Sequence, residues 1–352
     1  MESIIKHRVI QNDTTAFELL EKRDSNNKTL WYRAEIETEV CREKLCELAF
    51  INIYWDEVGD YLKFTLPEER DLTKNDHTPF DVSDYQKLDE ILADPENELK
   101  YYSFHEINDA VENLRKEYED VDGITGATPI GMVDAVVNGA ALSSYTFWHL
   151  VYGAARDTIK QHVRKKTNQE YISQKLKSNR SNFRIWAIEE AKELFQTEDA
   201  ITHEIMQLVS DDPNKKVSNE ALNFFTDALL EKRDIQKKLM HQFYKASHEM
   251  KIDILNRQKK LRVIYPETFD FLLAEFAEKR IGVLAFSSIM EIAQSVKKPS
   301  ESSFKIIREL LLHDNYYVAR KAYDFVVEHP SNIKGLKKNM KIFERKYADR
   351  LD

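Results

Sequence analysis

The stretch WYRAEIETEV, residues 31–40, alternates apolar and charged side chains, and this alternation decides the fold of the first part of the chain. Tyr32 and Ile36 fall on one side of the alternation, whereas Arg33 and Glu35 fall on the other. Successive side chains of a β-strand point to opposite faces of a sheet. The pattern therefore predicts an antiparallel strand with one buried face and one face in water.

The segments around this strand extend it into a sheet. CELAFINIYW, residues 46–55, is apolar on both faces and predicts a central strand. DEVGD, residues 56–60, is a turn signal, and YLKFTL, residues 61–66, alternates again. Together these segments predict a meander of at least three strands, which follows a short amphipathic helix over residues 3–24.

Two helices are predicted between this sheet and a glycine-rich loop. The first covers residues 83–92, begins at a cap formed by Asp81 or Ser83, and stops at Asp94, which precedes a proline. The second ends where the loop begins. A small antiparallel sheet combined with helices is typical of the α+β class.

The remainder of the chain predicts only helices. After residue 182 the amphipathic segments have ordinary helical lengths, and no strand-like alternation occurs. Small residues in mid-helix, which let a neighbouring helix approach closely, indicate HEAT-like repeats. An irregular helical bundle is the alternative. Each group that carries the pattern has three residues spaced four apart with Ala in the middle, and the groups start 30, 64 and 37 residues apart. The groups are Ala187, Ala191, Phe195; Val217, Ala221, Phe225; Ile281, Ala285, Ile289; and Val318, Ala322, Val326.

Length and composition limit the class of protein. A chain of 352 residues predicts two domains, which we place at residues 1–165 (α+β) and 166–352 (HEAT-like repeats or a helical bundle). The formal net charge of −9 argues against nucleic-acid binding, because neutralising phosphates needs a surplus of Lys and Arg. No apolar run is long enough to predict a transmembrane segment.

The N-terminus lacks the apolar core of a secretory signal, which predicts a cytoplasmic location. If a leader has been removed, the location is instead periplasmic or exported. Cys41 and Cys46 flank the loop between two predicted strands, where they form either a disulfide across the hairpin or a pair of small thiols. Two cysteines are too few for a cysteine-built zinc site, and no metal is predicted.

Residues 121–128, VDGITGAT, form the one stretch that is suited to cofactor chemistry. Gly123 and Gly126 lie close together, and Pro129 follows the stretch directly. Proline is favoured at the first helical position, so Thr128 is predicted to cap the N-terminus of a helix. A helix N-terminus preceded by glycines is a favourable position for a phosphate group.

Within this stretch, Asp122, Thr125, Gly126, Ala127 and Thr128 match the signature Asp-x-x-Ser/Thr-Gly-Ala-Thr. The first domain thereby resembles the FMN-binding domains in subunits of the sodium-pumping NADH:quinone reductase and the related Rnf electron-transport complex. The resemblance implies that FMN is attached to Thr128 through a phosphodiester bond. It also implies that Gly126 and Ala127 let the backbone approach the phosphate, and that Asp122 is a recognition or loop-tying residue.

Pro129 and Ile130 depart from the family pattern, which usually continues with a further small hydroxyl residue. A tight turn at Gly123 and Gly126, followed by a capped helix, is the alternative interpretation of the same residues.

Other candidate residues fit structural roles better. The aromatic residues of YTFWHLVYG, residues 145–153, recur at helical spacing, so they and His149 are expected in the core. Asp76 and His77 are adjacent and rarely reach the same atom, which favours a hydrogen bond that ties the loop over a proton-transfer pair. The motifs G-x-S-x-G, H-E-x-x-H and Walker A are absent, which argues against a conventional hydrolase.

The resemblance implies a flavoprotein of electron transfer. The helical-repeat domain that follows is expected to dock a protein partner. The alternative is a non-enzymatic interaction scaffold whose FMN-binding-like domain has no cofactor. These two hypotheses leave open whether the chain is an enzyme.

Overall fold

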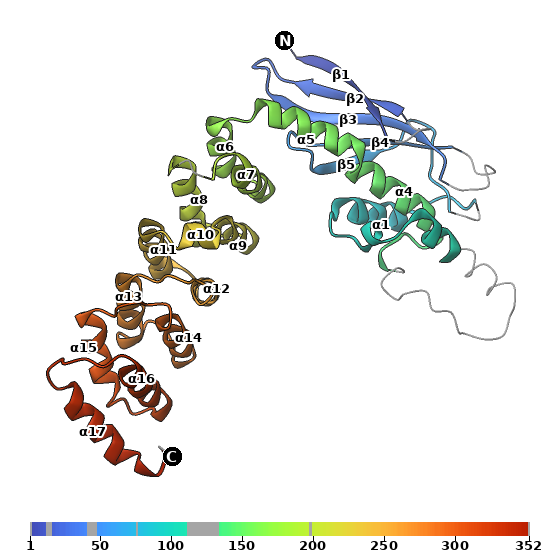
Figure 1. Ribbon diagram of the computed structural model, residues 1–352. Coiled ribbons are helices and arrows are strands. Elements are labelled where there is room, and N and C mark those ends of the chain that lie inside the picture. Colours follow the sequence, from blue (N-terminus) through green and yellow to red (C-terminus); the bar gives the residue numbers. More distant parts are fainter. Residues whose placement is uncertain are drawn as a thin grey trace, which may run out of the picture. The chain divides into compact units, whose positions relative to one another are not determined.

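A computed structural model shows that the chain divides into two compact units, Met1–Thr167 and Asn168–Asp352 (Figure 1). The first unit combines a sheet with helices, and the second is built from helices. The expected classes, α+β followed by all-α, are therefore confirmed. The residues that the structure describes are 2–11, 16–40, 48–74, 77–110, 134–196 and 199–350.

Five strands form one antiparallel sheet, in which each strand pairs with the next in sequence. Three of the strands lie where the sequence predicts them. The turn between the last two is closed by Asp56 N–H donating to the Asp60 carbonyl at 2.8 Å. The strands are β1 Ser3–Ile10, β2 Ala16–Arg23, β3 Thr29–Thr38, β4 Ala49–Trp55 and β5 Tyr61–Thr65.

The helix predicted over residues 3–24 is wrong, because these residues form the hairpin partners β1 and β2. Val9, Phe17 and Leu19 are buried, and on each strand the inward positions follow a period of two. A helix would have placed Ile4 in the apolar face, whereas its side chain is 60% exposed. The few apolar residues of this stretch fit one face of a helix as well as one face of a strand, so their pattern does not distinguish the two elements.

Helices pack along one face of the sheet, as Figure 1 shows for α5 and α4. Asp81 caps α1, since its carboxylate accepts hydrogen bonds from the backbone amides of Ser83 and Asp84. The Trp55 indole N–H of β4 donates to the Val151 carbonyl of α4 at 2.9 Å, which ties the helix to the centre of the sheet. These elements are α1 Val82–Ala93, the short 3₁₀ helix η1 Glu98–Tyr101, α4 Ala141–Tyr152 and α5 Ala154–Lys166.

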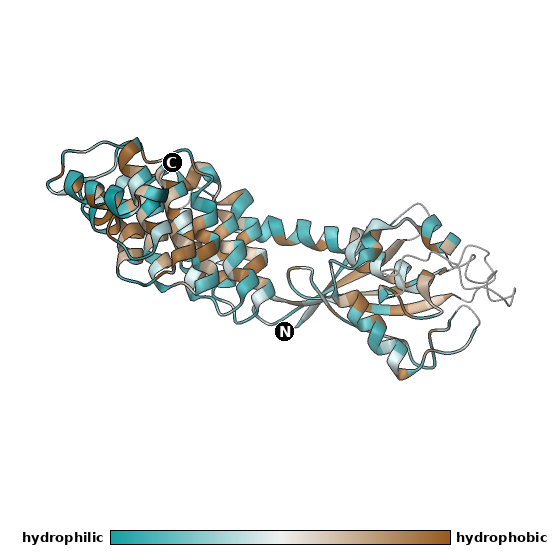
Figure 2. Cartoon of the chain, turned by 90° about the horizontal axis from the view of Figure 1, so that it is seen from below, coloured by the Kyte–Doolittle hydropathy of each residue, from teal (hydrophilic) through white to brown (hydrophobic). Residues whose placement is uncertain are grey.

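The second unit is a stack of helical pairs in two layers. Helices α6, α8, α11, α13, α15 and α17 pack on one another in a first layer, and α7, α9, α12, α14 and α16 form the second layer. Hydrophobic residues lie on the facing sides of the helices, as Figure 2 shows. The bounds are α6 Gln169–Leu176, α7 Ser181–Leu194, α8 Asp199–Asp211, α9 Lys215–Phe224, α10 Asp227–Leu230, α11 Arg233–Lys245, α12 His248–Gln258, α13 Pro266–Ala277, α14 Val283–Ala293, α15 Glu301–Leu310, α16 Tyr316–Glu328, α17 Leu336–Lys346 and η2 Ala348–Arg350.

The stack has a regular repeat that the sequence pattern only partly reveals. The five second-layer helices begin 34, 33, 35 and 33 residues apart. Two of the predicted groups, those that start at Val217 and Val318, begin at the third residue of their helices. The group that starts at Ala187 begins about one helical turn after the third residue of α7. The group that starts at Ile281 begins about one turn before the third residue of α14. These shifts explain the irregular spacing in the sequence.

Among the residues that the structure describes, no helix is both long and apolar enough to cross a membrane.

Candidate functional site

The predicted FMN site lies outside the described residues. Asp122, Gly123, Thr125, Gly126, Ala127 and Thr128 all belong to the segment 111–133. The structure therefore neither brings these residues together nor separates them. What the structure shows about the site comes from the described residues on either side of this segment.

Both ends of the segment continue into buried parts of the first unit. Ile107 and Asn108 are buried before it, and Val137 and Ala140 are buried after it. The Ser144 hydroxyl accepts from Val137 N–H and donates to the Ala140 carbonyl, both at 3.0 Å, which fixes the turn into α4. The described residues that flank the candidate loop are thus anchored in the core.

The aromatic residues of α4 belong largely to this core. Phe147 and Trp148 are buried, and the Trp148 indole N–H donates to the Asp94 carbonyl at 2.9 Å. The Tyr152 hydroxyl donates to the Leu92 carbonyl at 2.8 Å. The expected core role is confirmed for Phe147 and Trp148, whose rings are enclosed by the fold.

A smaller group of half-buried rings joins the two flanking segments. Phe104, which precedes the candidate loop, lies with its ring centroid 5.8 Å from Tyr145, and Tyr145 lies 4.2 Å from His149. The His149 Nε2 is buried and has no hydrogen-bond partner among the described residues. Burial also lowers the pKa of His149, which favours the neutral imidazole. We call Phe104, Tyr145 and His149 the ring cluster.

A buried carboxylate, Glu21 on β2, forms a polar network that the sequence analysis missed. Arg23 donates to it through Nε and Nη2, both at 2.8 Å, and Thr29 Oγ1 donates at 2.6 Å. Lys166 Nζ of α5 donates at 3.0 Å, and His7 Nε2 lies 3.1 Å away. The network joins the edge of the sheet to the C-terminal end of α5.

This network is structural rather than catalytic. Burial alone raises the pKa of Glu21, but the hydrogen bonds from Arg23, Thr29, Lys166 and His7 outweigh it and hold that pKa well below its usual range. A carboxylate that is ionised and fully hydrogen-bonded at neutral pH is a poor general base. The period-two alternation Phe17, Leu19, Glu21 would have placed it inside the sheet, but the helix prediction concealed this signal.

The remaining predicted residues offer little chemistry. His77 occupies a left-handed turn with φ of 64°, and its N–H donates to the Lys74 carbonyl at 2.9 Å. Asp76, Cys41 and Cys46 lie outside the described residues. In the described part of the chain, no group of three or more His, Cys, Asp or Glu side chains is placed to hold a metal ion.

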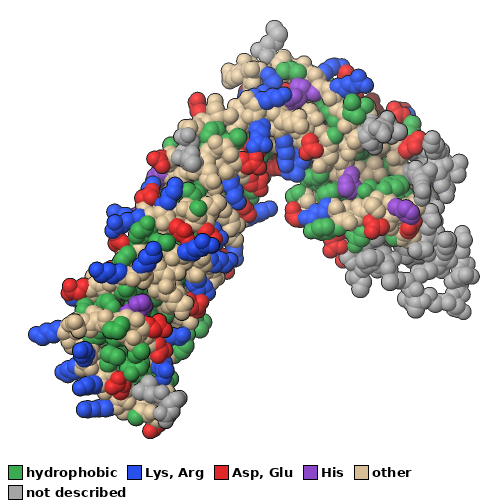
Figure 3. Space-filling view, in the orientation of Figure 1, with side chains coloured by type: hydrophobic (Ala, Val, Ile, Leu, Met, Phe, Trp, Pro, Cys, Tyr) green, Lys and Arg blue, Asp and Glu red, His purple; other side chains and the backbone are tan. Residues whose placement is uncertain are grey.

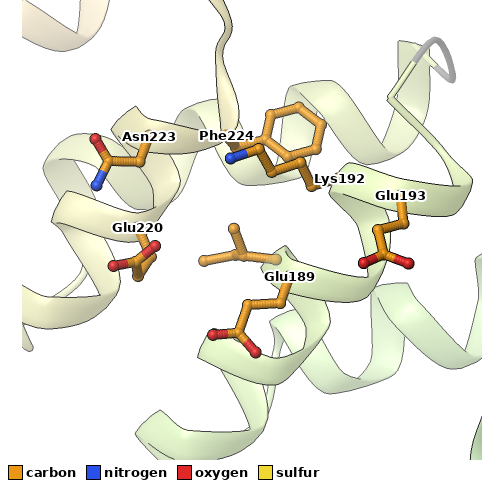
Figure 4. Close-up of a pocket in the computed structure, with 7 residues that line it drawn as sticks. Glu189, Lys192, Glu193, Glu220, Asn223 and Phe224 are labelled. Carbon is orange, nitrogen blue, oxygen red and sulfur yellow. The ribbon is translucent and has the colours of Figure 1, made fainter.

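In the second unit, a pocket of about 300 Å³ opens between α7 and α9. Figure 4 shows Glu189 and Lys192 of α7 opposite Glu220 and Asn223 of α9. Ile188 and Phe224 form its apolar lining, and both are buried. The pocket is a small groove between repeats, of the kind that helical stacks offer to protein partners.

Comparison with protein-family models, with curated proteins and with solved structures gives no match to this chain. The link to FMN therefore rests on the residues of the loop signature.

Proposed function

We propose that this chain is a flavoprotein that carries FMN through a phosphodiester bond at Thr128 and takes part in electron transfer. The observation that supports the proposal is the unbroken signature at Asp122, Thr125, Gly126, Ala127 and Thr128. Gly123 adds backbone freedom to the same loop. Bound FMN would supply the redox chemistry, while the chain would hold and orient it.

The ring cluster is the described surface that fits a flavin best. Phe104 and Tyr145 present aromatic rings from the two sides of the candidate loop. The Nε2 of His149, which has no partner in the part of the chain that the structure describes, is a buried polar atom that a flavin nitrogen or oxygen would satisfy. Trp148 does not fit this role, because its ring is buried and its N–H is already bonded. We therefore assign ring contact to the cluster.

The second unit would serve as a docking domain. A stack of helical pairs presents a long surface of repeated grooves, and such surfaces commonly bind proteins. The pocket between α7 and α9 is one such groove. The second candidate function, a scaffold without cofactor, rests on the same surface and differs only in the first unit.

The two candidates are separated by co-expressing the chain with a flavin transferase and denaturing it before electrophoresis. The flavoprotein hypothesis predicts a fluorescent band, because the flavin stays bound to the denatured polypeptide, and predicts that the band is lost in Thr128→Ala. Thr158→Ala is the matched control, because Thr158 lies in α5 and its hydroxyl donates to the Ala154 carbonyl within its own helix. A dark band from well-folded wild-type protein would favour the scaffold.

A further inference from the structure

The last helix of the second unit, α17, has an exposed face of a single charge sign. Residues 334–346 contain six basic residues and one acidic residue, in a chain whose net charge is −9. All six basic side chains are exposed, and Figure 3 shows blue side chains gathered at the lower left, where α15 and α17 lie in Figure 1. The basic residues, which we call the α17 stripe, are Lys334, Lys337, Lys338, Lys341, Arg345 and Lys346.

No acidic side chain among the described residues forms an ion pair with the stripe. The one carboxylate in this segment, Glu344, accepts a hydrogen bond from Tyr323 at 2.9 Å instead. Some cations on other helices of the stack are paired, as Lys215 is with Glu249 at 2.7 Å and Arg320 with Asp324 at 2.9 Å. The stripe is distinguished by its density, with six cations and a single carboxylate within 13 residues.

The helix is held in a fixed orientation, so the stripe is presented to solvent. Leu336 and Phe343 are buried on the side that packs against α15 and α16. Lys337, Lys341 and Arg345 follow one another at intervals of four residues and extend about 12 Å along the opposite side. Side chains of like charge four residues apart destabilise a helix. Contact with solvent alone therefore does not explain why this face carries only cations at that spacing.

We propose that the α17 stripe is a docking surface for an acidic segment of a protein partner. This inference names the partner chemistry for the docking role proposed above, and it does not depend on the flavin. Ile342 lies within the stripe and is 39% exposed, so it offers an apolar contact beside the cations. A short segment with several carboxylates and an apolar side chain complements both features.

Nucleic acid and anionic membranes fit the stripe less well. Both are extended polyanions, and outside the six stripe residues the second unit, residues 168–352, has 26 basic and 28 acidic residues, so it offers them no further surplus of cations. Five of the six basic residues are lysines, which lack the planar fork that binds phosphate in a bidentate manner. A segment about as long as the stripe needs no cations beyond it.

The experiment uses the full chain and a fluorescent 12-residue peptide that is rich in Glu and contains Leu. Its controls are the same peptide with Gln for Glu, a 20-base-pair DNA duplex, and vesicles that contain phosphatidylserine. The test variant is Lys341→Glu with Arg345→Glu. The matched variant, Lys237→Glu with Lys245→Glu on α11, makes the same change of charge at exposed residues. Fluorescence anisotropy and vesicle sedimentation measure binding.

We expect the acidic peptide to bind, the Gln peptide not to bind, and the α17 variant to lose at least about tenfold in affinity. The α11 variant should keep binding within about twofold. The α17 variant should melt close to wild type, because the new carboxylate at position 341 gains an i,i+4 pair with Lys337 but repels the new carboxylate at position 345 at the same interval. Equal loss in both variants, or duplex or vesicle binding as tight as the peptide, would overturn the proposal. If the acidic peptide does not bind, the proposals for FMN at Thr128 and for docking at the other grooves of the stack still stand.

Discussion

Glu21 shows at the scale of one residue how the first unit holds α5 to its sheet. It has no exposed surface and accepts from Arg23, Thr29 and Lys166. Glu21→Ala would leave Arg23 and Lys166 without their buried partner. We expect the free energy of unfolding to fall by about 3 kcal/mol, the cost of breaking a buried ion pair. Urea unfolding followed by circular dichroism measures the change, and a loss below about 1 kcal/mol would contradict the buried network.

The same residue predicts a pH dependence with a definite sign. The pKa of Glu21 is depressed in the folded state, so the carboxylate stabilises the fold above the unfolded value of 4.5. As the pH falls below 4.5, the unfolded chain takes up the proton first, and this stability is progressively lost. The difference in stability between wild type and Glu21→Gln should therefore be largest near pH 7 and shrink below pH 4.5. A constant difference between about pH 7 and about pH 3 would contradict this account.

Gly59 predicts a backbone effect at the turn between β4 and β5. Its φ is +92°, and a Cβ there would lie 3.3 Å from Ile159 of α5. Gly59→Ala should lower the free energy of unfolding by about 1–2 kcal/mol, through strain and through this close approach. Gly282→Ala is the control, because nothing lies within 4 Å of its would-be Cβ, and we expect a change within about 0.5 kcal/mol. Equal effects would argue against the turn geometry.

At the scale of the element, α12 carries a buried amide that nothing satisfies among the described residues. Gln258 is fully buried, and neither its Oε1 nor its Nε2 has a hydrogen-bond partner there. Gln258→Met keeps the shape and removes the unpaired atoms, so stability should rise by about 1 kcal/mol. Thermal unfolding of the full chain measures the shift.

Gln236 on α11 provides the contrast. It is equally buried, but its Nε2 donates to the Val263 carbonyl, and its Oε1 accepts from Tyr265 N–H and Thr268 Oγ1. Gln236→Met would leave these partners unpaired and should cost about 1–3 kcal/mol. If both substitutions shift stability in the same direction, hydrogen bonding is not what distinguishes the two amides.

Gln258 also explains why the sequence revealed the repeat only in part. The pattern depended on an apolar residue, an alanine four residues later and an apolar residue four later again, and α12 carries Met250, Ile254 and Gln258 at those positions, so the alanine is missing too. A buried glutamine breaks such a pattern although it lies inside the stack. By contrast, β3 was predictable because its alternation is strict and its register is set by one buried face. Residues 3–24 were not, because their few apolar positions match a helix and a strand equally well.

At the scale of the whole molecule, the two compact units predict separable folding. Residues 168–352 should form a helical fragment that unfolds cooperatively without the first unit, since each pair of the stack packs on its neighbours. Far-ultraviolet circular dichroism and thermal unfolding of the fragment test this. An aggregated or unfolded fragment would show that the two units share one core.

The candidate site shows where prediction from sequence ends. The loop signature is defined by residue types at fixed spacings, so the candidate residues between Asp122 and Thr128 could be named without any structure. The ring cluster could not be named, because Phe104 and Tyr145 are distant in sequence and meet only through the packing of their segments. Sequence spacing assigned the aromatic residues of 145–153 and His149 to the core, which is right for Phe147 and Trp148, whereas Tyr145 and His149 are only half-buried.

The central claim is that the oxygen of Thr128 carries FMN. Its most direct test is the intact mass of the denatured chain after co-expression with a flavin transferase. The account predicts an increase equal to FMN less one water, present in wild type and in Thr158→Ala and absent in Thr128→Ala. An unchanged mass in folded wild-type protein, or an adduct that persists in Thr128→Ala, would contradict it.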